Sequence, residues 1–400
     1  MSLAGFDEHR HSVTTSTADV SYIDVGDGPP ALFVHGLATN AHLWQELIGH
    51  LGGADRRCIA IDLPLHGHSP VRPGQELTIG AFADVLADFI ASLGLWEIDL
   101  VAHDIGGGIA QVLAARHPER LRTLTLTDCE TQDNIPPAAM ASTVELARTG
   151  QLAAAAPAII GDPAAARGFF VTGYQDPDFL TTDMVQTFLD PVLGTPESAE
   201  RLQELIAGLG PSELAASEPA LRQLDVPAII IWGTDDDFFD LKWAYWLQGE
   251  IRSAYQVTEM TGAKLFFPHE NAAELAAHIQ KHWNTAAQAY VSNPEATRTN
   301  LTDALCDAID EYHSGEASLA GAASLSALMH DVNTTIRELA RLDDPAWAAQ
   351  MRDQWKIATA VLKEAGTSTT LSTPQLDRIA DAVQTLRDLA QMPNPTRADE

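Results

Sequence analysis

Five short apolar runs, each ending in a small, acidic or glycine residue or a proline turn, constrain the fold of this 400-residue chain most strongly. They are ALFVHG (31–36), CIAIDLP (58–64), IDLVAHD (98–104), TLTLTD (123–128) and PAIIIWG (227–233). Unbroken apolar runs are typical of parallel strands buried on both faces, and helical patterns separate these runs. We therefore predict an α/β fold built on a mostly parallel sheet. Ligands of such sheets bind beyond the carboxyl ends of the strands, so functional residues are expected there.

Two long segments lack strand runs of this kind. Residues 130–225 are rich in alanine and leucine and lie between two strands of one sheet, which predicts a helical cap over the strand ends. Residues 289–400 have apolar residues at helical spacing and predict a C-terminal all-α domain. The α/β core is then formed by residues 1–129 and 226–288. The apolar face of the C-terminal helices is a candidate homodimer interface.

The charge balance narrows the classes of partner. There are 24 Lys and Arg residues against 55 Asp and Glu residues, giving a net charge of −31. Such a chain repels phosphate backbones and anionic lipids, so neither nucleic acid nor a membrane is an expected partner, whereas a neutral small molecule is. No run approaches the length of a membrane span, and the N-terminus lacks the features of a signal peptide, which predicts a cytoplasmic protein. The three cysteines have no CxxC spacing, so we expect neither a metal nor another cofactor.

The run at 98–104 passes directly into a glycine-rich stretch, and Asp104 lies at the junction between Ala102 and Gly106. Small residues at these two positions suit a sharp strand-to-helix turn that exposes the side chain between them. The pattern resembles the nucleophile elbow of the α/β-hydrolase family. With aspartate at its centre it resembles the branch that contains epoxide hydrolases and haloalkane dehalogenases. The resemblance implies that Asp104 attacks a saturated carbon, giving an ester that water then cleaves; a helix N-cap is the alternative role.

Two other loops extend the resemblance, which covers residues 20–285. The sequence from His35 to Leu37 is similar to the family's oxyanion-hole loop, and residues 62–69 are similar to its D-x-P-G-H-G-x-S loop. The resemblance implies that the backbone N–H groups of Leu37 and Ile105 hold an oxygen of the nucleophile. His35 is then expected to fix the backbone of the loop.

Candidates for a supporting acid follow the later strands. The WGTDDD sequence resembles the end of the strand where the family carries its catalytic acid, and counting from the glycine selects Asp236. In part of the branch the acid follows the preceding strand instead, which here corresponds to Asp128 or Glu130. We rank Asp236 first.

The family's catalytic histidine is missing from its expected position. Where the family has G-x-H-F, this chain reads GAKLFF, and alignment on the glycine and phenylalanine places Leu265 at the histidine position. Leucine cannot accept a proton, so the usual base for the hydrolytic water is absent. His269, four residues further on, is the candidate replacement. His103 is expected to point away from the site.

Three functions remain open. The first is a hydrolase-like enzyme in which Asp104 attacks a neutral apolar electrophile. An epoxide is preferred to a haloalkane, because Leu37 and Ile105 offer no side-chain donor for a halide, whereas Tyr174 in the cap could protonate an epoxide oxygen. The second is a cyclase, isomerase or lyase that uses Asp104 as a general acid or base. The third is a catalytically silent binding protein.

Overall fold

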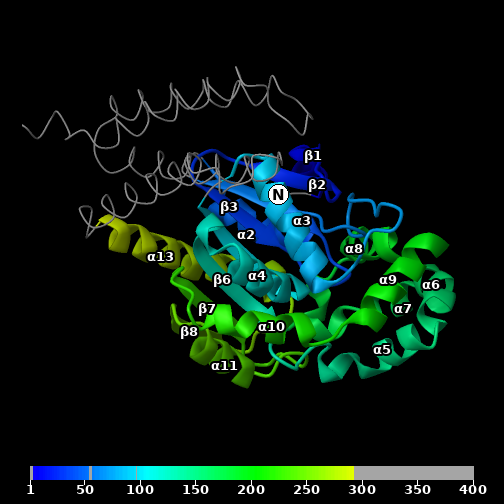
Figure 1. The fold of residues 1–400 in the computed structure, drawn as a ribbon. Coiled ribbons are helices and arrows are strands. Elements are labelled where there is room, and N and C mark those ends of the chain that lie inside the picture. The colour runs from blue at the N-terminus through cyan, green and yellow to red at the C-terminus, as the bar shows by residue number, and fades with distance from the viewer. Residues whose placement is uncertain (1–2, 54–55, 96, 292–400) are drawn as a thin grey trace, which may run out of the picture. The chain divides into compact units, whose positions relative to one another are not determined.

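The computed structural model describes residues 3–53, 56–95 and 97–291. Its centre is a sheet of eight strands in the order β1-β2-β4-β3-β5-β6-β7-β8 (Figure 1). The pairs β1–β2 and β2–β4 are antiparallel, and the other pairs are parallel. The strands are β1 (Arg10–Thr14), β2 (Asp19–Val25), β3 (Pro30–Val34), β4 (Arg57–Ile61), β5 (Ile98–Asp104), β6 (Leu121–Cys129), β7 (Ala228–Gly233) and β8 (Ala254–Met260). The predicted α/β fold with a mostly parallel sheet is confirmed.

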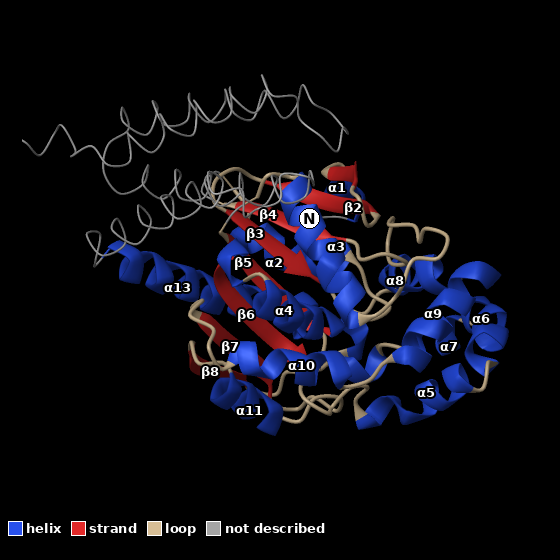
Figure 2. Ribbon diagram, viewed as in Figure 1, coloured by secondary structure: helices blue, strands red, loops and turns tan. Residues whose placement is uncertain are grey.

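Each of the five apolar runs coincides with one of the strands β3 to β7. These strands are buried along almost their whole length, because helices cover both faces of the sheet (Figure 2). The strands β1, β2 and β8 were not identified from the sequence. They lie toward the two edges of the sheet and carry more polar residues, so no unbroken apolar run marks them.

The helices of the core connect these strands. They are α1 (Leu3–Asp7), α2 (Gln45–Leu51), α3 (Ile79–Ser92), α4 (Ile105–Arg116), α11 (Lys242–Glu250), α12 (Phe267–Glu270) and α13 (Ala272–Val291). Thr78 caps α3 by accepting a hydrogen bond from the backbone N–H of Ala81 at 3.1 Å. Helix α4 follows β5 without a loop, and Asp104 is at once the last residue of the strand and the N-cap of the helix. This junction places Asp104 at the carboxyl edge of the sheet.

The segment between β6 and β7 is helical. It contains α5 (Ala141–Arg148), α6 (Gln151–Gly161), α7 (Pro163–Gly168), α8 (Thr182–Leu193), α9 (Pro196–Gly208) and α10 (Ser212–Leu221). Proline begins α7 and α9, where its missing N–H has no cost, and Thr195 forms a capping box with Ser198. Helices α5 to α9 pack against one another as a group, which we call the helical insertion. Helix α10 packs instead against α4 of the core.

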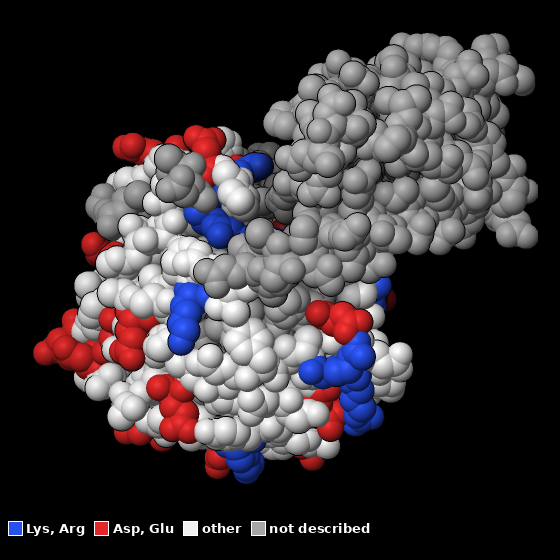
Figure 3. Space-filling view, turned by 90° about the vertical axis from the view of Figure 1, so that its left-hand side faces the viewer, with Lys and Arg blue, Asp and Glu red and all other residues white. Residues whose placement is uncertain are grey.

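The chain divides into two compact units between Ala286 and Ala287, close to the predicted end of the core at residue 288. Residues 292–400, which make up almost all of the predicted C-terminal all-α domain (289–400), lie outside the described residues. In the described part of the chain, no helix is long and apolar enough to cross a membrane. On the face shown in Figure 3, the acidic and basic side chains of the described residues form small separate groups on a largely uncharged surface.

Candidate active site

Asp104 lies at a strained turn. Its φ is 55° and its ψ is −133°, a conformation that L-residues rarely adopt. The backbone around it is tightly packed. A Cβ atom on Gly36 would lie 2.6 Å from Cβ of Asp104, and one on Gly106 would lie 2.4 Å from the carbonyl oxygen of His35. Such strain is typical of functional sites, and the two glycines allow the turn to form.

A side chain at Gly106 should therefore break the turn. We expect Gly106→Ala to lower the free energy of unfolding by about 1–3 kcal/mol, because the backbone carbonyls that it would contact have little room to move. The matched control is Gly161→Ala, since a Cβ atom there meets nothing within 4 Å. Denaturant titration of both variants checks the prediction. Equal stability of the two variants would contradict it.

One carboxylate oxygen of Asp104 is held by two backbone donors. The N–H groups of Leu37, at 3.1 Å, and of Ile105 both donate to Oδ1. These are the two donors that the sequence analysis selected. Because both contacts go to Oδ1, Oδ2 is left for a ligand in the adjoining cavity. The same two N–H groups are placed to hold the oxyanion of a tetrahedral intermediate formed at this carboxyl carbon.

His35 fixes the loop that carries one of these donors. Its Nδ1 is hydrogen-bonded to the carbonyl oxygen of Gly36 at 2.7 Å, and its Nε2 accepts from the N–H of Leu63 at 2.9 Å. These partners require a neutral imidazole with its hydrogen on Nδ1. Burial also favours the neutral imidazole, because it lowers the pKa of His35 to about 4. His35 thus positions Leu37 and has no free nitrogen for catalysis.

A cavity of about 390 Å³ opens beside Asp104. Core and helical insertion both contribute to its wall, and four phenylalanines supply much of the apolar surface: Phe169, Phe170, Phe238 and Phe266. Leu265 also lines it. Apart from Asp104, the polar side chains among its described lining residues are Thr143 and Thr172. The cavity therefore suits a neutral, mainly apolar small molecule.

Four carboxyl groups are gathered at the ends of β5, β6 and β7. Burial raises the pKa of Asp104 to about 6, and the charge of Asp236 adds to this increase. The two backbone hydrogen bonds act in the opposite direction and lower the pKa. Burial likewise raises the pKa of Asp236 to about 6. The pKa values of Asp128 and Glu130, which are fully buried, are raised well above the usual range. Asp128 and Glu130 were predicted as alternatives to Asp236, but the structure brings all three acids together.

The structure gives His269 and Tyr174 a different environment. Nδ1 of His269 is hydrogen-bonded to the hydroxyl of Tyr174 at 3.0 Å, and both side chains are buried. Among the described residues, no hydrogen bond joins His269 to Asp104 or Asp236, and neither His269 nor Tyr174 lines the cavity at Asp104. Burial lowers the pKa of His269 to about 4, so it is neutral at physiological pH. The pair instead connects the segment before α8 to helix α12, in which His269 lies.

His103 also lies away from the cavity. Its Nδ1 contacts the hydroxyl of Thr127 at 3.0 Å, and its ring packs between Trp44 and Phe267. The cavity wall consequently contains Leu265 but no histidine of the described residues. The wall residues contributed by the helical insertion, such as Thr143 and Phe170, were missed because no motif marks them in the sequence.

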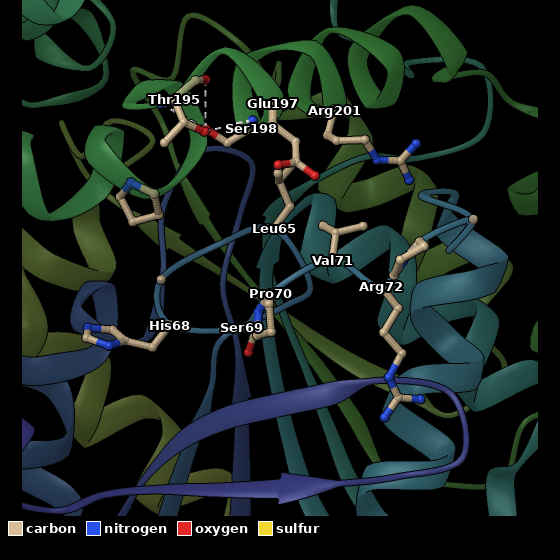
Figure 4. Close-up of a pocket in the computed structure, with 14 residues that line it drawn as sticks. Leu65, His68, Ser69, Pro70, Val71, Arg72, Thr195, Glu197, Ser198 and Arg201 are labelled. Atoms are coloured by element: carbon tan, nitrogen blue, oxygen red, sulfur yellow. Dashed lines mark hydrogen bonds between the residues drawn. The ribbon is translucent and has the colours of Figure 1, made fainter.

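A larger cavity, of about 600 Å³, lies between residues 65–74 and the start of α9 (Figure 4). It contains Arg72 and Arg201 but not Asp104. Arg72 is engaged by Asp19, and Arg201 by Glu204 and the carbonyl oxygen of Gln75. The two arginines of this cavity are thus already engaged, and the smaller cavity, which contains Asp104, remains the candidate active site.

Comparison with known proteins identifies related sequences. Residues 29–169 match the sequence profile of the alpha/beta hydrolase fold family. The non-heme chloroperoxidase CPO-A1 of Kitasatospora aureofaciens is 38% identical over 115 residues, which are 28% of this chain and 41% of that protein. A haloalkane dehalogenase of Mesorhizobium japonicum is 33% identical over 120 residues, 30% of this chain and 38% of that protein. The matched segment thus spans about two fifths of the length of these relatives.

Solved structures share the fold over a longer part of the chain. The epoxide hydrolase CorEH superposes with a TM-score of 0.59 and 18% identity, covering 69% of this chain and 98% of that one. A putative lipase from Acinetobacter baumannii superposes with a TM-score of 0.61 and 17% identity, covering 71% of this chain and 96% of that chain. At this level of identity the likeness concerns the fold alone.

Proposed function

We propose that this chain, which has the α/β-hydrolase fold, is a hydrolase-like enzyme whose Asp104 attacks a neutral apolar electrophile. One observation carries the proposal: the two backbone donors hold Oδ1 of Asp104, while the residue lines a cavity with an otherwise mainly apolar wall. A carboxylate held in this way presents its second oxygen to a ligand without having to reorient. Relatives named as a haloalkane dehalogenase and a chloroperoxidase agree with a hydrolase-type enzyme.

An epoxide suits this cavity better than a haloalkane. Oδ2 of Asp104 would bond to a ring carbon, the C–O bond of the ring would break, and the ring oxygen would take a proton from water or a cavity hydroxyl, giving a hydroxyalkyl ester. A leaving halide needs donors that stay with it, and the two N–H groups at the site already bind Asp104. Relief of ring strain lowers the demand for such donors. Thr143 and Thr172 are the hydroxyl-bearing residues of the cavity wall.

Hydrolysis of that ester is the step that this site supports poorly. The water would attack the carboxyl carbon, and Leu37 and Ile105 would hold the resulting oxyanion. Among the described residues, no histidine lines the cavity to take the proton of this water, because Leu265 is part of the wall and His269 binds Tyr174. We infer that the ester is long-lived.

A second candidate, acid/base catalysis without a covalent bond, is favoured by one observation. With a pKa of about 6, Asp104 can both accept and donate a proton near neutral pH. A cyclase, isomerase or lyase requires no hydrolytic water, so the absence of an imidazole would not impair it.

Intact-protein mass spectrometry tests the covalent proposal. We expect incubation with a panel of small apolar epoxides to add the mass of one epoxide to the protein, and peptide mapping to place it on Asp104. The Asp104→Asn variant should gain no mass, because an amide is a poor nucleophile. Asp133→Asn, at an exposed carboxylate, is the matched control and should react like the parent protein.

The outcomes separate the candidates. Diol formation without an adduct would mean that another group activates water. Absence of both adduct and product with epoxides and alkyl halides, for parent and variant alike, would contradict the covalent proposal.

A further inference from the structure

Two buried carboxyl groups approach each other beneath the loop that follows β7. Oδ1 of Asp128 accepts the backbone N–H of Gly233 at 2.9 Å, and Oδ1 of Asp236 accepts that of Phe238 at 2.7 Å. Their second oxygens, Oδ2 of each residue, are buried and receive no donor from the described residues. The two side chains lie within hydrogen-bonding reach of one another. Two neighbouring buried carboxyl groups thus each have an oxygen without a donor from the described residues.

Two ionised carboxylates cannot satisfy this contact, because both only accept hydrogen bonds and their charges repel. A neighbouring cation could compensate, but the nearby Lys264 pairs with Asp237 at 2.8 Å. The other titratable groups that act on the pair are acidic: Asp104, Glu130 and Asp237. We propose that Asp128 and Asp236 hold a single proton between them, with the carboxyl group of Asp128 donating to the carboxylate of Asp236.

The environment of each group places the proton on Asp128. Asp128 is fully buried, and burial together with the charge of Asp236 raises its pKa well above the usual range. The pKa of Asp236 rises only to about 6, because the hydrogen bond from Asp128 and backbone donors favour its ionised form. Near neutral pH the pair therefore carries one negative charge, on Asp236.

The shared proton gives Asp128 a role at the proposed site. The resemblance to the hydrolase family implies an imidazole partner for Asp236. No histidine of the described residues is hydrogen-bonded to Asp236, and the carboxyl group of Asp128 supplies a donor instead. Because the charge of Asp236 contributes to the raised pKa of Asp104, the protonation of the pair controls the charge that Asp104 experiences. Asp128 is thus a positioning residue, and this consequence rests on the proposed function of Asp104.

Infrared spectroscopy tests the shared proton without any substrate. Protonated carboxyl groups have a C=O stretch distinct from that of carboxylates, and Asp128 and Glu130 are expected to contribute to it at neutral pH. We expect Asp128→Asn to remove as much of this band as the comparator Glu130→Gln removes. An asparagine can still accept from Gly233 and donate to Asp236, so this variant should fold. An unchanged band in folded Asp128→Asn would show that Asp128 is ionised, and would overturn the proposal.

Thermal unfolding at neutral pH separates this role from simple packing. Asp128→Asn keeps the donor and should retain the melting temperature of the parent at neutral pH, whereas Asp128→Val lacks it and should melt lower. Equal losses in the two variants would overturn the proposal, because the hydrogen bond would then be unimportant.

If the proposed chemistry holds, the pH midpoint for alkylation of Asp104 should stay unchanged in Asp128→Asn. It should fall in Asp128→Val, where an undonated Asp236 takes up a proton. Failure of alkylation in the parent would contradict only the proposed function.

Discussion

Replacing Leu265 with histidine is expected to convert a long-lived ester on Asp104 into one that turns over. Leu265 and Asp104 line the same cavity. The loop that carries Leu265 is hydrogen-bonded to the loop that carries Asp236, because the backbone N–H of Asp235 donates to the carbonyl oxygen of Ala263 at 3.0 Å. An imidazole at position 265 would therefore lie near both the ester and an acid able to orient it. General-base assistance contributes about 10²–10⁴-fold to such a step, and we expect this increase in the rate of ester hydrolysis.

Single-turnover measurements check this expectation. The adduct is formed first, the excess epoxide is removed, and the loss of the added mass is followed with time. Leu265→Gln is the matched control, because glutamine brings a polar side chain of similar size but no base. Equal rates of adduct loss in the histidine and glutamine variants would show that polarity or water entry, and not a base, limits the reaction. A fast loss in the parent protein would show that another base is already present.

Replacing Asp104 with asparagine is expected to stabilise the protein at neutral pH while it abolishes alkylation. The pKa of Asp104 rises from its usual 3.8 to about 6 in the folded protein, so folding favours the protonated form. The contribution of Asp104 to stability is then greatest below its unfolded pKa of about 3.8 and is lost as the pH rises through about 6. A shift of about two pKa units corresponds to about 3 kcal/mol. Asparagine also has nearly the size of aspartate and keeps an oxygen that can accept from the N–H groups of Leu37 and Ile105.

Denaturant titration over a pH series checks this second expectation. We expect Asp104→Asn to be more stable than the parent by about 2–3 kcal/mol above the pKa of Asp104, and the difference to vanish under acidic conditions where the parent carboxyl is protonated. The exposed Asp133→Asn should show no such pH-dependent difference. If Asp104→Asn were destabilised at neutral pH, the ionised carboxylate would be a net stabilising group, and the burial argument would fail.

The structure also explains which site residues motif spacing could predict. Leu37, Asp104 and Ile105 belong to turns that must be built from adjacent residues, so their roles follow from local sequence, and the structure brings them together. His269 shows the limit of spacing. Its position suggests a substitute base, yet its nitrogen bonds Tyr174, a contact between residues 95 apart in the sequence. Nothing local specifies such a contact.

The acids at the strand ends are a second case in which local sequence does not reveal a contact. From the sequence, Asp236 was ranked above Asp128 and Glu130 as the supporting acid, as if only one of the three could have that role. Adjacent parallel strands, β6 and β7, end at one edge of the sheet, which brings the carboxyl groups into a single buried cluster. Because of this proximity, the charge of Asp236 contributes to the raised pKa values of Asp128 and Glu130.

The sequence by itself determined the sheet and the turn that presents Asp104, because buried parallel strands require unbroken apolar runs and the turn requires small residues at fixed positions. Only the tertiary structure decided what surrounds Asp104. The cavity wall combines the helical insertion with loops from the far end of the core, and the acid cluster combines the ends of three strands. Burial and the distances between these groups control their pKa values, and both quantities depend on residues that are remote in sequence.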